Sequence, residues 1–172
     1  MRPLLVLLLA ALVGAAEWPA TVNIAGQEVA LRGSGRLTWA WWKIYDVALH
    51  APAGSDPIAA ATPRRLAFRY LRDFSAEDLG KATSKTARER IGSAPAAEVE
   101  AGITAINALW PAVVEGDELT LTYAPGQGTT VVHNGTPRGT VVGDAFAGVL
   151  FAIWLGADPI DEDLRQELAG TR

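Results

Sequence analysis

Alternating apolar and polar residues predict a pair of β-strands within residues 33–52, GSGRLTWAWWKIYDVALHAP. The stretch holds Trp39, Trp41 and Trp42, which are three of the 6 tryptophans in the chain. Aromatic and β-branched side chains suit a pleated and largely covered surface. We therefore expect this strand pair to lie deep in a sheet.

The same period of two predicts further strands before and after this pair. They cover residues 21–31, as two short strands around Ala25-Gly26, and residues 65–72 and 118–126. Residues 51–63, rich in small residues and proline, predict a surface loop between two of the strands.

Asn134-Gly135 marks a hairpin near the end of the predicted sheet. This pair is preferred in tight two-residue hairpin turns, and the segments 129–132 and 140–142 on either side favour strands. Asn134 also begins a glycosylation sequon, Asn-Gly-Thr, but the turn accounts for the same residues.

Helical spacing of apolar residues replaces the period of two in the middle and at the end of the chain. Ser75 followed by acidic residues is typical of a helix start, and Gly92 of a helix end. Gly143-Asp144 precedes a strongly apolar segment that ends at Gly156. We expect helices at residues 75–91, 95–110, 145–155 and 161–168.

The order of these elements indicates the fold class. A run of strands, two helices, more strands and two final helices lack strict strand–helix alternation, which favours an α+β fold. We expect a large antiparallel sheet with helices packed on one face. No repeat or long linker divides the chain, so a single domain over residues 17–172 is the simplest organisation.

Residues 1–16 have the layout of a secretory signal peptide. They combine one basic residue, an apolar run over residues 4–13 and small residues before the predicted cleavage after Ala16. A membrane span is the alternative, but a span needs roughly 20 apolar residues and this run has only about ten. We therefore expect a periplasmic or secreted protein without a stable membrane span after cleavage.

Composition narrows the classes of partner and site. The 172 residues include 15 Lys and Arg against 19 Asp and Glu, so the formal net charge is −4. That balance argues against nucleic acid or an anionic membrane surface as the main partner. With no cysteine, the chain has no disulfide and no thiolate metal site. Nothing in the sequence indicates a cofactor or a particular protein partner.

Candidate chemistry is sparse. His50 and His133 are far apart in sequence and suit strand or turn positions, and no general catalytic or metal-binding motif occurs. The acidic residues Asp158, Asp161, Glu162 and Asp163 lie at a predicted helix start, where the helix dipole accounts for them without a metal. Arg36 stands out, because a charge beside so many aromatic residues is costly to bury without a counter-ion or ligand.

Several segments in this order resemble the bacterial, exported branch of the chalcone-isomerase-like proteins. The matching segments cover nearly all of residues 22–170: GSGR, KIYDVALH, YLRDFSAEDL, LTLTYAPGQGTTVVHNG and DAFAGVLFAIWLGADPIDEDLRQELAG. The resemblance implies an open-faced β-sandwich, in which a ligand cleft lies between an antiparallel sheet and the helices on one face.

The resemblance also implies candidate functions. Plant chalcone isomerases close a flavanone ring, and related plastid members bind fatty acids. A strand arginine of the family contacts the acidic ligand group, and Arg36 falls at that position. The isomerase threonines fall near Asp46 and Ile153, and residues 75–85 contain neither the tyrosine nor the asparagine of the first helix. Most of the isomerase's polar residues are therefore missing.

The sequence leaves three hypotheses. The leading one is a non-catalytic binder of a small hydrophobic or carboxylate ligand, such as a fatty acid, in a cleft between sheet and helices. Its predicted ligand-binding residues are Arg36, Trp39, Trp41, Trp42, Phe146, Phe151 and Trp154. The second is an isomerase or intramolecular lyase acting on an unidentified substrate. The third is a structural or partner-binding protein whose aromatic residues form a filled core and whose Arg36 pairs with Asp46 or Asp144.

Overall fold

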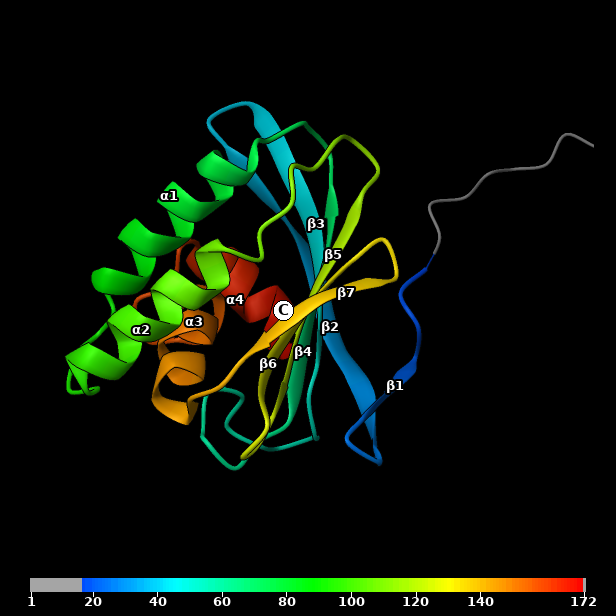
Figure 1. Cartoon of the computed structure of the whole chain (residues 1–172). Helices are drawn as coiled ribbons and strands as arrows, with labels where there is room; N and C mark the ends of the chain where they lie inside the picture. Colours follow the sequence, from blue (N-terminus) through cyan, green and yellow to red (C-terminus); the bar gives the residue numbers. More distant parts are fainter. Residues whose placement is uncertain (1–16, 172) are drawn as a thin grey trace, which may run out of the picture.

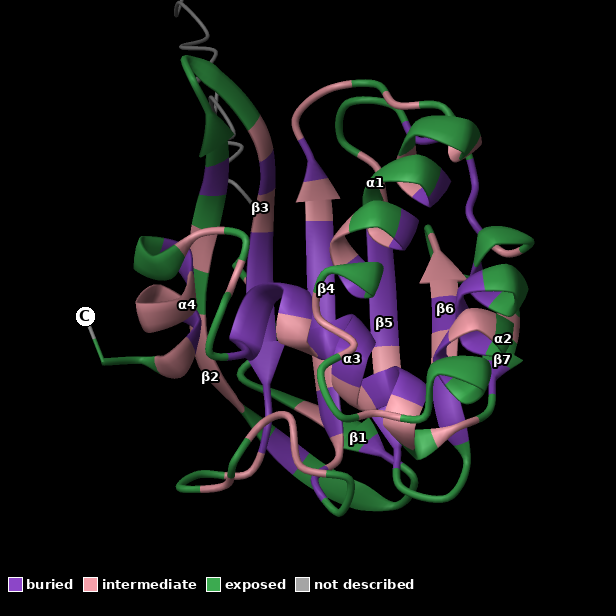
Figure 2. Cartoon of the chain, turned by 90° about the vertical axis from the view of Figure 1, so that its left-hand side faces the viewer, coloured by how far each residue is buried: buried purple, intermediate pink, exposed green. Residues whose placement is uncertain are grey.

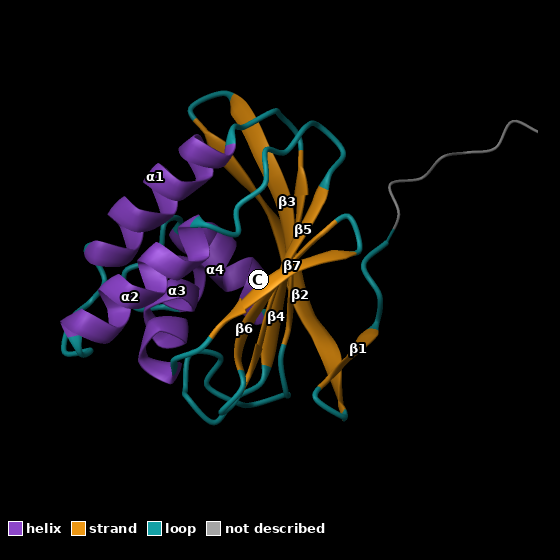
Figure 3. Cartoon of the chain, in the orientation of Figure 1, coloured by secondary structure: helices purple, strands orange, loops and turns teal. Residues whose placement is uncertain are grey.

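A seven-stranded antiparallel sheet with helices on one face forms the body of the protein (Figures 1 and 3). The computed structural model describes residues 17–171. The strands pair in the order of the sequence, β1-β2-β3-β4-β5-β6-β7, so each lies beside its neighbour along the chain. The predicted α+β class and antiparallel sheet are confirmed.

The elements have the following bounds. The strands are β1 Thr21–Ile24, β2 Gln27–Trp39, β3 Trp42–His50, β4 Arg64–Tyr70, β5 Glu118–Ala124, β6 Gly128–His133 and β7 Thr136–Val141. The helices are α1 Ala76–Arg88, α2 Ala96–Asn107, α3 Asp144–Leu155 and α4 Glu162–Ala169. The predicted helices are present within a few residues of their expected ends. The predicted second short strand instead continues as β2 without a break through the first half of the aromatic stretch.

The main core lies between the sheet and the helices. The central strands β3, β4 and β5 are buried or half-buried along most of their length (Figure 2). Side chains alternate between the two faces of a strand, and Val47, Phe68 and Leu121 belong to the same buried apolar cluster as the side chains of α3. Helix α3 lies in the middle of this layer, and most of its side chains are buried. Because it is surrounded by other elements, its sequence is apolar on all sides rather than along one stripe.

Two glycines in β2 allow helix α4 to approach the sheet closely. A Cβ atom placed on Gly33 would clash with the backbone oxygen of Glu167, and one on Gly35 would clash with the Glu167 side chain. Asp161 caps the N-terminus of helix α4, and its side chain accepts a hydrogen bond from the Leu164 backbone N–H. The glycines that precede Arg36 therefore serve helix packing.

The side of the sheet away from the helices is more polar. Arg36, Asp46, Arg69 and Glu118 are cross-strand neighbours there, on four successive strands. The N-terminal segment and β1 lie on this side (Figure 1). The ring of Trp18 lies 4.4 Å from the Arg69 guanidinium carbon, and His50 Nε2 lies 2.8 Å from the Pro19 carbonyl oxygen.

The expectation that the tryptophans of residues 33–52 lie deep in the sheet is wrong. Trp39, Trp41 and Trp42 are 72%, 80% and 50% exposed, respectively. Trp41 lies in the two-residue turn that joins β2 to β3, and Trp39 and Trp42 form the last pair before this turn. The alternation continues to the end of the hairpin, but the covering helices do not reach that far.

The predicted signal peptide lies outside the described residues, and its cleavage stays a prediction. Within residues 17–171, the structure has no helix that is both long enough and apolar enough to cross a membrane.

Candidate functional site

An apolar pocket of about 360 Å³ lies between the sheet, α1 and α3. Its floor comes from β2, β3 and β4, one wall from α1, and the opposite wall from α3 and the loop before α4. The lining residues are Leu37, Ile44, Tyr45, Tyr70, Phe74, Asp78, Leu79, Ala82, Thr83, Thr86, Ile153, Trp154 and Ile160. No lysine or arginine is among them.

Tyr45 and Trp154 join the floor of the pocket to its α3 wall. The indole Nε1–H of Trp154 donates a 2.8 Å hydrogen bond to the Tyr45 hydroxyl oxygen, and both groups are buried. The Tyr45 ring also packs edge-on against Phe68 and Tyr70, with ring centroids 5.1 and 5.9 Å apart. Burial raises the pKa of Tyr45, so its hydroxyl remains protonated at neutral pH.

Tyr70 brings a second hydroxyl group to the pocket. No hydrogen bond joins this hydroxyl to another described residue, although only 5% of Tyr70 is exposed. Burial raises the pKa of Tyr70 as well, and the neighbouring Tyr45 adds to the shift. The group is therefore a hydrogen-bond donor at neutral pH that remains available to a ligand oxygen.

Helix α1 supplies the wall facing the sheet. Its N-terminus is fixed by a capping box, in which Ser75 Oγ accepts from the Asp78 N–H and the Asp78 carboxylate accepts from the Ser75 N–H. Hydrogen bonds from the Ser75 hydroxyl and backbone hold the pKa of Asp78 below its usual value. This carboxylate is the only charged group among the lining residues, and it is negative.

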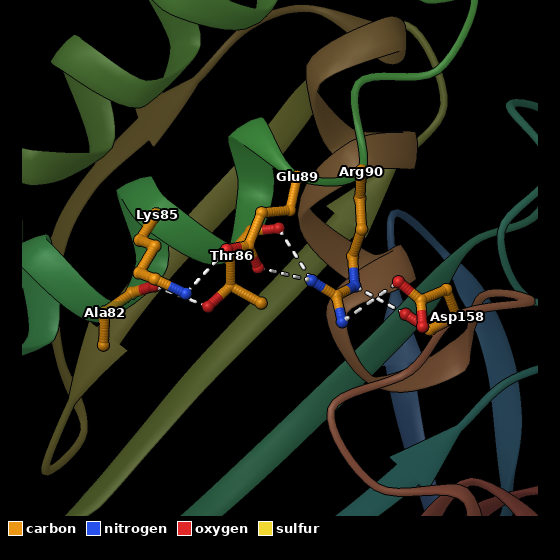
Figure 4. Close-up of polar contacts among 6 residues, drawn as sticks. All are labelled: Ala82, Lys85, Thr86, Glu89, Arg90 and Asp158. Carbon is orange, nitrogen blue, oxygen red and sulfur yellow. Dashed lines mark hydrogen bonds and ion pairs between the residues drawn. The ribbon is translucent and has the colours of Figure 1, made fainter.

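Arg90, just beyond the end of α1, fixes the rim of the pocket (Figure 4). Its Nε donates a 2.6 Å hydrogen bond to the Asp158 carbonyl oxygen, and Nη1 donates a 2.9 Å bond to the Thr86 carbonyl oxygen. Arg90 thereby connects α1 to the loop between α3 and α4. That loop carries Ile160, whose N–H is bonded to the Ile153 carbonyl, and both residues line the pocket.

Of the predicted ligand-binding residues, the structure places Trp154 in this pocket. Phe146 and Phe151 are fully buried in the core. The three hairpin tryptophans lie at the exposed end of β2 and β3, outside the pocket between sheet and helices where they were predicted.

Arg36 also lies outside the pocket. It follows the opposite parity from Leu37, which lines the pocket, and it therefore points away from the helices. Two hydrogen bonds of 2.5 and 2.9 Å join its guanidinium to the Asp46 carboxylate, as the third hypothesis expected for this arginine. Its pKa is raised by this side-chain hydrogen bonding. A role for Arg36 in ligand binding stays a prediction.

The pocket tyrosines and the α1 residues were not predicted as site residues. Tyr45 and Tyr70 each have the parity of a buried strand position, and Leu79 and Thr83 lie four apart on a helix. Those patterns could have placed them on the face between sheet and helices. They could not have shown that this part of the interface stays open.

At another place in the sheet–helix interface, Arg64 holds the loop before β4. It is fully buried, and Nη1 donates to the carbonyl oxygens of Ala59 and Thr62. Its guanidinium carbon lies 4.2 Å from the Tyr123 ring centroid and 4.6 Å from that of Phe151. Desolvation lowers the pKa of Arg64 to about 10. Among residues 17–171, no cluster of His, Asp or Glu has the makeup of a metal site.

Comparison with known proteins identifies the family. The sequence profile described as chalcone isomerase-like matches residues 10–170. The chain belongs to the chalcone isomerase-like family. The crystal structure of a fatty-acid binding protein from Arabidopsis thaliana is similar to this chalcone isomerase-like fold, with a TM-score of 0.73. The likeness covers 89% of this chain and 91% of that chain at 13% sequence identity. No curated protein matches the sequence.

Proposed function

We propose that this protein binds a small, largely hydrophobic ligand in the pocket between α1, α3 and the sheet, without catalysing a reaction. The observation that carries the proposal is the pocket itself, which is lined almost wholly by apolar groups in the interior of a fold that otherwise packs tightly. Apolar pockets of this size with a few polar groups are typical of small-molecule sites. The similar fold of a fatty-acid binding protein supports the same class of ligand.

The polar groups indicate which end of a ligand would lie deepest. The Tyr70 hydroxyl can donate to a carbonyl or carboxyl oxygen, and Trp154 fixes the position of the Tyr45 hydroxyl beside it. No cation lies among the lining residues within 17–171, and Asp78 on α1 disfavours a nearby anion. We therefore infer a ligand with a neutral oxygen acceptor, such as an ester, a ketone or a protonated acid, in preference to an ionised carboxylate.

The titrating residues argue for binding rather than isomerisation. Tyr45, Tyr70 and Asp78 are the pocket residues that can lose a proton. The tyrosine pKa values are raised and the Asp78 pKa is lowered, so none of them lies near neutral pH. General acid–base catalysis works best with a group whose pKa is close to the working pH. A pocket of this kind suits retention of a ligand.

Residues 1–16 indicate where we expect this binding activity. Their signal-peptide pattern supports export, and binding would then take place in the periplasm or outside the cell.

The test is a binding measurement with a variant that fills the pocket. Residues 17–172 contain every described strand and helix, so this fragment is the protein to use. A Thr83→Trp substitution places a bulky ring in the pocket from α1, whereas Lys81→Trp places the same ring on the outer surface of α1. We expect a fluorescent fatty acyl ester to bind the wild type and Lys81→Trp equally well, and to bind Thr83→Trp at least tenfold more weakly.

Two further variants test the orientation of the ligand. Tyr70→Phe should weaken ester binding severalfold, because the donor is lost while the ring is kept. Arg36→Ala should leave ester binding unchanged, because Arg36 lies on the other face of the sheet. Equal binding by the wild type and the Thr83 variant, or no binding of any acyl ester or acid, would refute the proposal. Enone turnover by the wild type would favour the isomerase.

A further inference from the structure

The end of the β2–β3 hairpin exposes more aromatic surface than an isolated surface residue would. We call residues 38–43, with the sequence TWAWWK, the tryptophan hairpin. Trp39 and Trp41 are 72% and 80% exposed, and Trp42 is half exposed. A cluster of large exposed apolar side chains marks an interaction surface in proteins that are otherwise well packed.

The hairpin projects from the sheet and contacts the segment after β4 through Trp42 and Arg72. It extends to one end of the molecule, beyond the layer of helices (Figure 1). The rings of Trp41 and Trp42 contact each other, with centroids 6.5 Å apart. The Arg72 guanidinium carbon lies 4.0 Å from the centroid of the Trp42 ring. These contacts hold Trp41 and Trp42 together and leave half or more of each side chain exposed to solvent.

Two cations at this end, Lys43 and Arg72, can contact phosphate groups. The tryptophan hairpin contains one charged residue, Lys43, and no acidic residue. Lys43 and Arg72 have no carboxylate partner among the described residues, whereas Arg36 at the base of the hairpin is neutralised by Asp46. The carboxylates near Arg72 belong to Asp73 and Glu115, and Asp73 accepts a hydrogen bond from the Glu115 N–H.

The exposed area is too small for a stable protein interface on its own. A tryptophan side chain buries about 150–250 Å². At the exposures given above, the three rings offer at most about 500 Å², and a stable interface needs roughly 800 Å² from each partner. A lipid bilayer does not require such a flat, extended surface, because its headgroup region encloses a narrow projection from several sides. Tryptophan, with an apolar ring and one N–H donor, is enriched in that region.

The position of the tryptophan hairpin relative to the pocket agrees with a lipid surface. Leu37 and Ile44, which immediately flank the hairpin in sequence, both line the pocket. We propose that the tryptophan hairpin docks this protein on phospholipid bilayers, with the rings in the headgroup region and the pocket end of the sheet facing the lipid. If the proposed ligand binding is correct, the ligand would then enter from the bilayer. Docking itself does not depend on an occupied pocket.

The experiment is vesicle flotation with residues 17–172, because the apolar run of residues 4–13 would itself bind lipid. Phosphatidylcholine vesicles, with and without phosphatidylglycerol, are mixed with the wild type and with the double variant Trp39→Ala, Trp41→Ala. We expect the wild type to float with both kinds of vesicle and the double variant to bind at least tenfold more weakly. The control, Val142→Ser, removes an exposed apolar side chain from the β7–α3 connection and should bind as the wild type does.

Tryptophan fluorescence tests whether the hairpin rings enter the bilayer. Tryptophan emission of the wild type should shift to shorter wavelength on vesicles and be quenched by brominated acyl chains, and the double variant should show neither change. Without Arg2, residues 17–172 have 14 Lys and Arg against 19 Asp and Glu, so their formal net charge is −5. Apolar contact must therefore dominate, and binding to phosphatidylcholine should survive about 0.5 M salt. Thr83→Trp should lose ester binding and keep vesicle binding, which separates this proposal from the proposed function.

Three results would overturn the docking proposal. The wild type could fail to bind vesicles, or the double variant, confirmed as folded by circular dichroism, could bind equally well. The third is a wild-type dimer in sedimentation velocity that becomes a monomer in the double variant, which would assign the tryptophan hairpin to contact between two copies of this chain.

Discussion

Tyr45 and Tyr70 lie side by side on neighbouring strands, but their hydroxyl groups have different roles. The Tyr45 oxygen accepts a hydrogen bond from buried Trp154, whereas the Tyr70 hydroxyl has no partner among the described residues. The parity of each strand is compatible with a buried position for both side chains, but it could not show this difference. The partner of Tyr45 is more than a hundred residues away in the chain.

Substitution of the two tyrosines by phenylalanine should separate these roles. Tyr45→Phe leaves the Trp154 N–H buried and unpaired, so we expect the free energy of unfolding to fall by about 1–3 kcal/mol. Tyr70→Phe removes no hydrogen bond within the protein, and its effect on stability should be within about 0.5 kcal/mol. Urea unfolding of both variants measures the difference. Equal losses in the two variants would show that the Tyr45–Trp154 hydrogen bond does not contribute to the free energy of unfolding.

At the scale of elements, the prediction of helices and strands was largely correct because their apolar periods are clear. Two helical glycines show that the apolar period does not reveal which positions are tightly packed. Gly102 in α2 faces Phe146 of α3, and an added Cβ would lie 2.2 Å from its ring. At Gly148 in α3, the nearest atom to an added Cβ is 3.9 Å away. The periodic pattern treats these glycines alike, but only Gly102 is required by packing.

Alanine substitutions should have opposite effects at these two positions. Gly102→Ala forces α2 and α3 apart, and overpacking of this kind costs about 1–3 kcal/mol. Gly148→Ala is sterically allowed and should be neutral or stabilise the protein by up to about 1 kcal/mol, because alanine favours the helix. Thermal unfolding of the two variants tests this. A Gly102 variant as stable as the wild type would show that the helices can shift without cost.

A second element-scale prediction concerns acid stability. Asp117, just before β5, accepts hydrogen bonds from the Asn134 side chain, the His133 ring and the Val114 N–H. These bonds lower its pKa from 3.8 to about 2. Because the folded-state pKa is depressed, the stabilisation is present above about pH 4 and is lost as the pH falls toward 2.

Asp117→Asn should therefore reduce the free energy of unfolding at pH 6 and flatten its decline between about pH 4 and pH 2. Urea unfolding at several pH values gives both quantities. Parallel pH curves for the wild type and the variant would show that Asp117 does not couple folding to protons. The side-chain amide of Asn134 donates to Asp117, and this structural use of Asn134 agrees with the interpretation of Asn134-Gly135 as a turn.

At the scale of the whole molecule, the sequence predicted the architecture better than the site. The resemblance and the element order both indicated a sheet with helices on one face, which is what the structure has. The site depended on which aromatic residues the helices cover, and alternation along a strand cannot show where the covering layer stops. The richest aromatic segment thus lies outside that layer, and the pocket is lined by Tyr45, Tyr70 and residues of α1.

The strictly sequential strand order leaves the sheet with two free edges, which are places where other chains could add strands and aggregate. Both outer strands are poor templates for such growth. Strand β1 spans only Thr21–Ile24, and β7 carries Pro137, which lacks an N–H, followed by the charged Arg138. The pairing of β7 with β6 is also irregular between Val131 and Val132. We therefore expect neither edge of this sheet to add strands from other copies readily, even when the protein is concentrated.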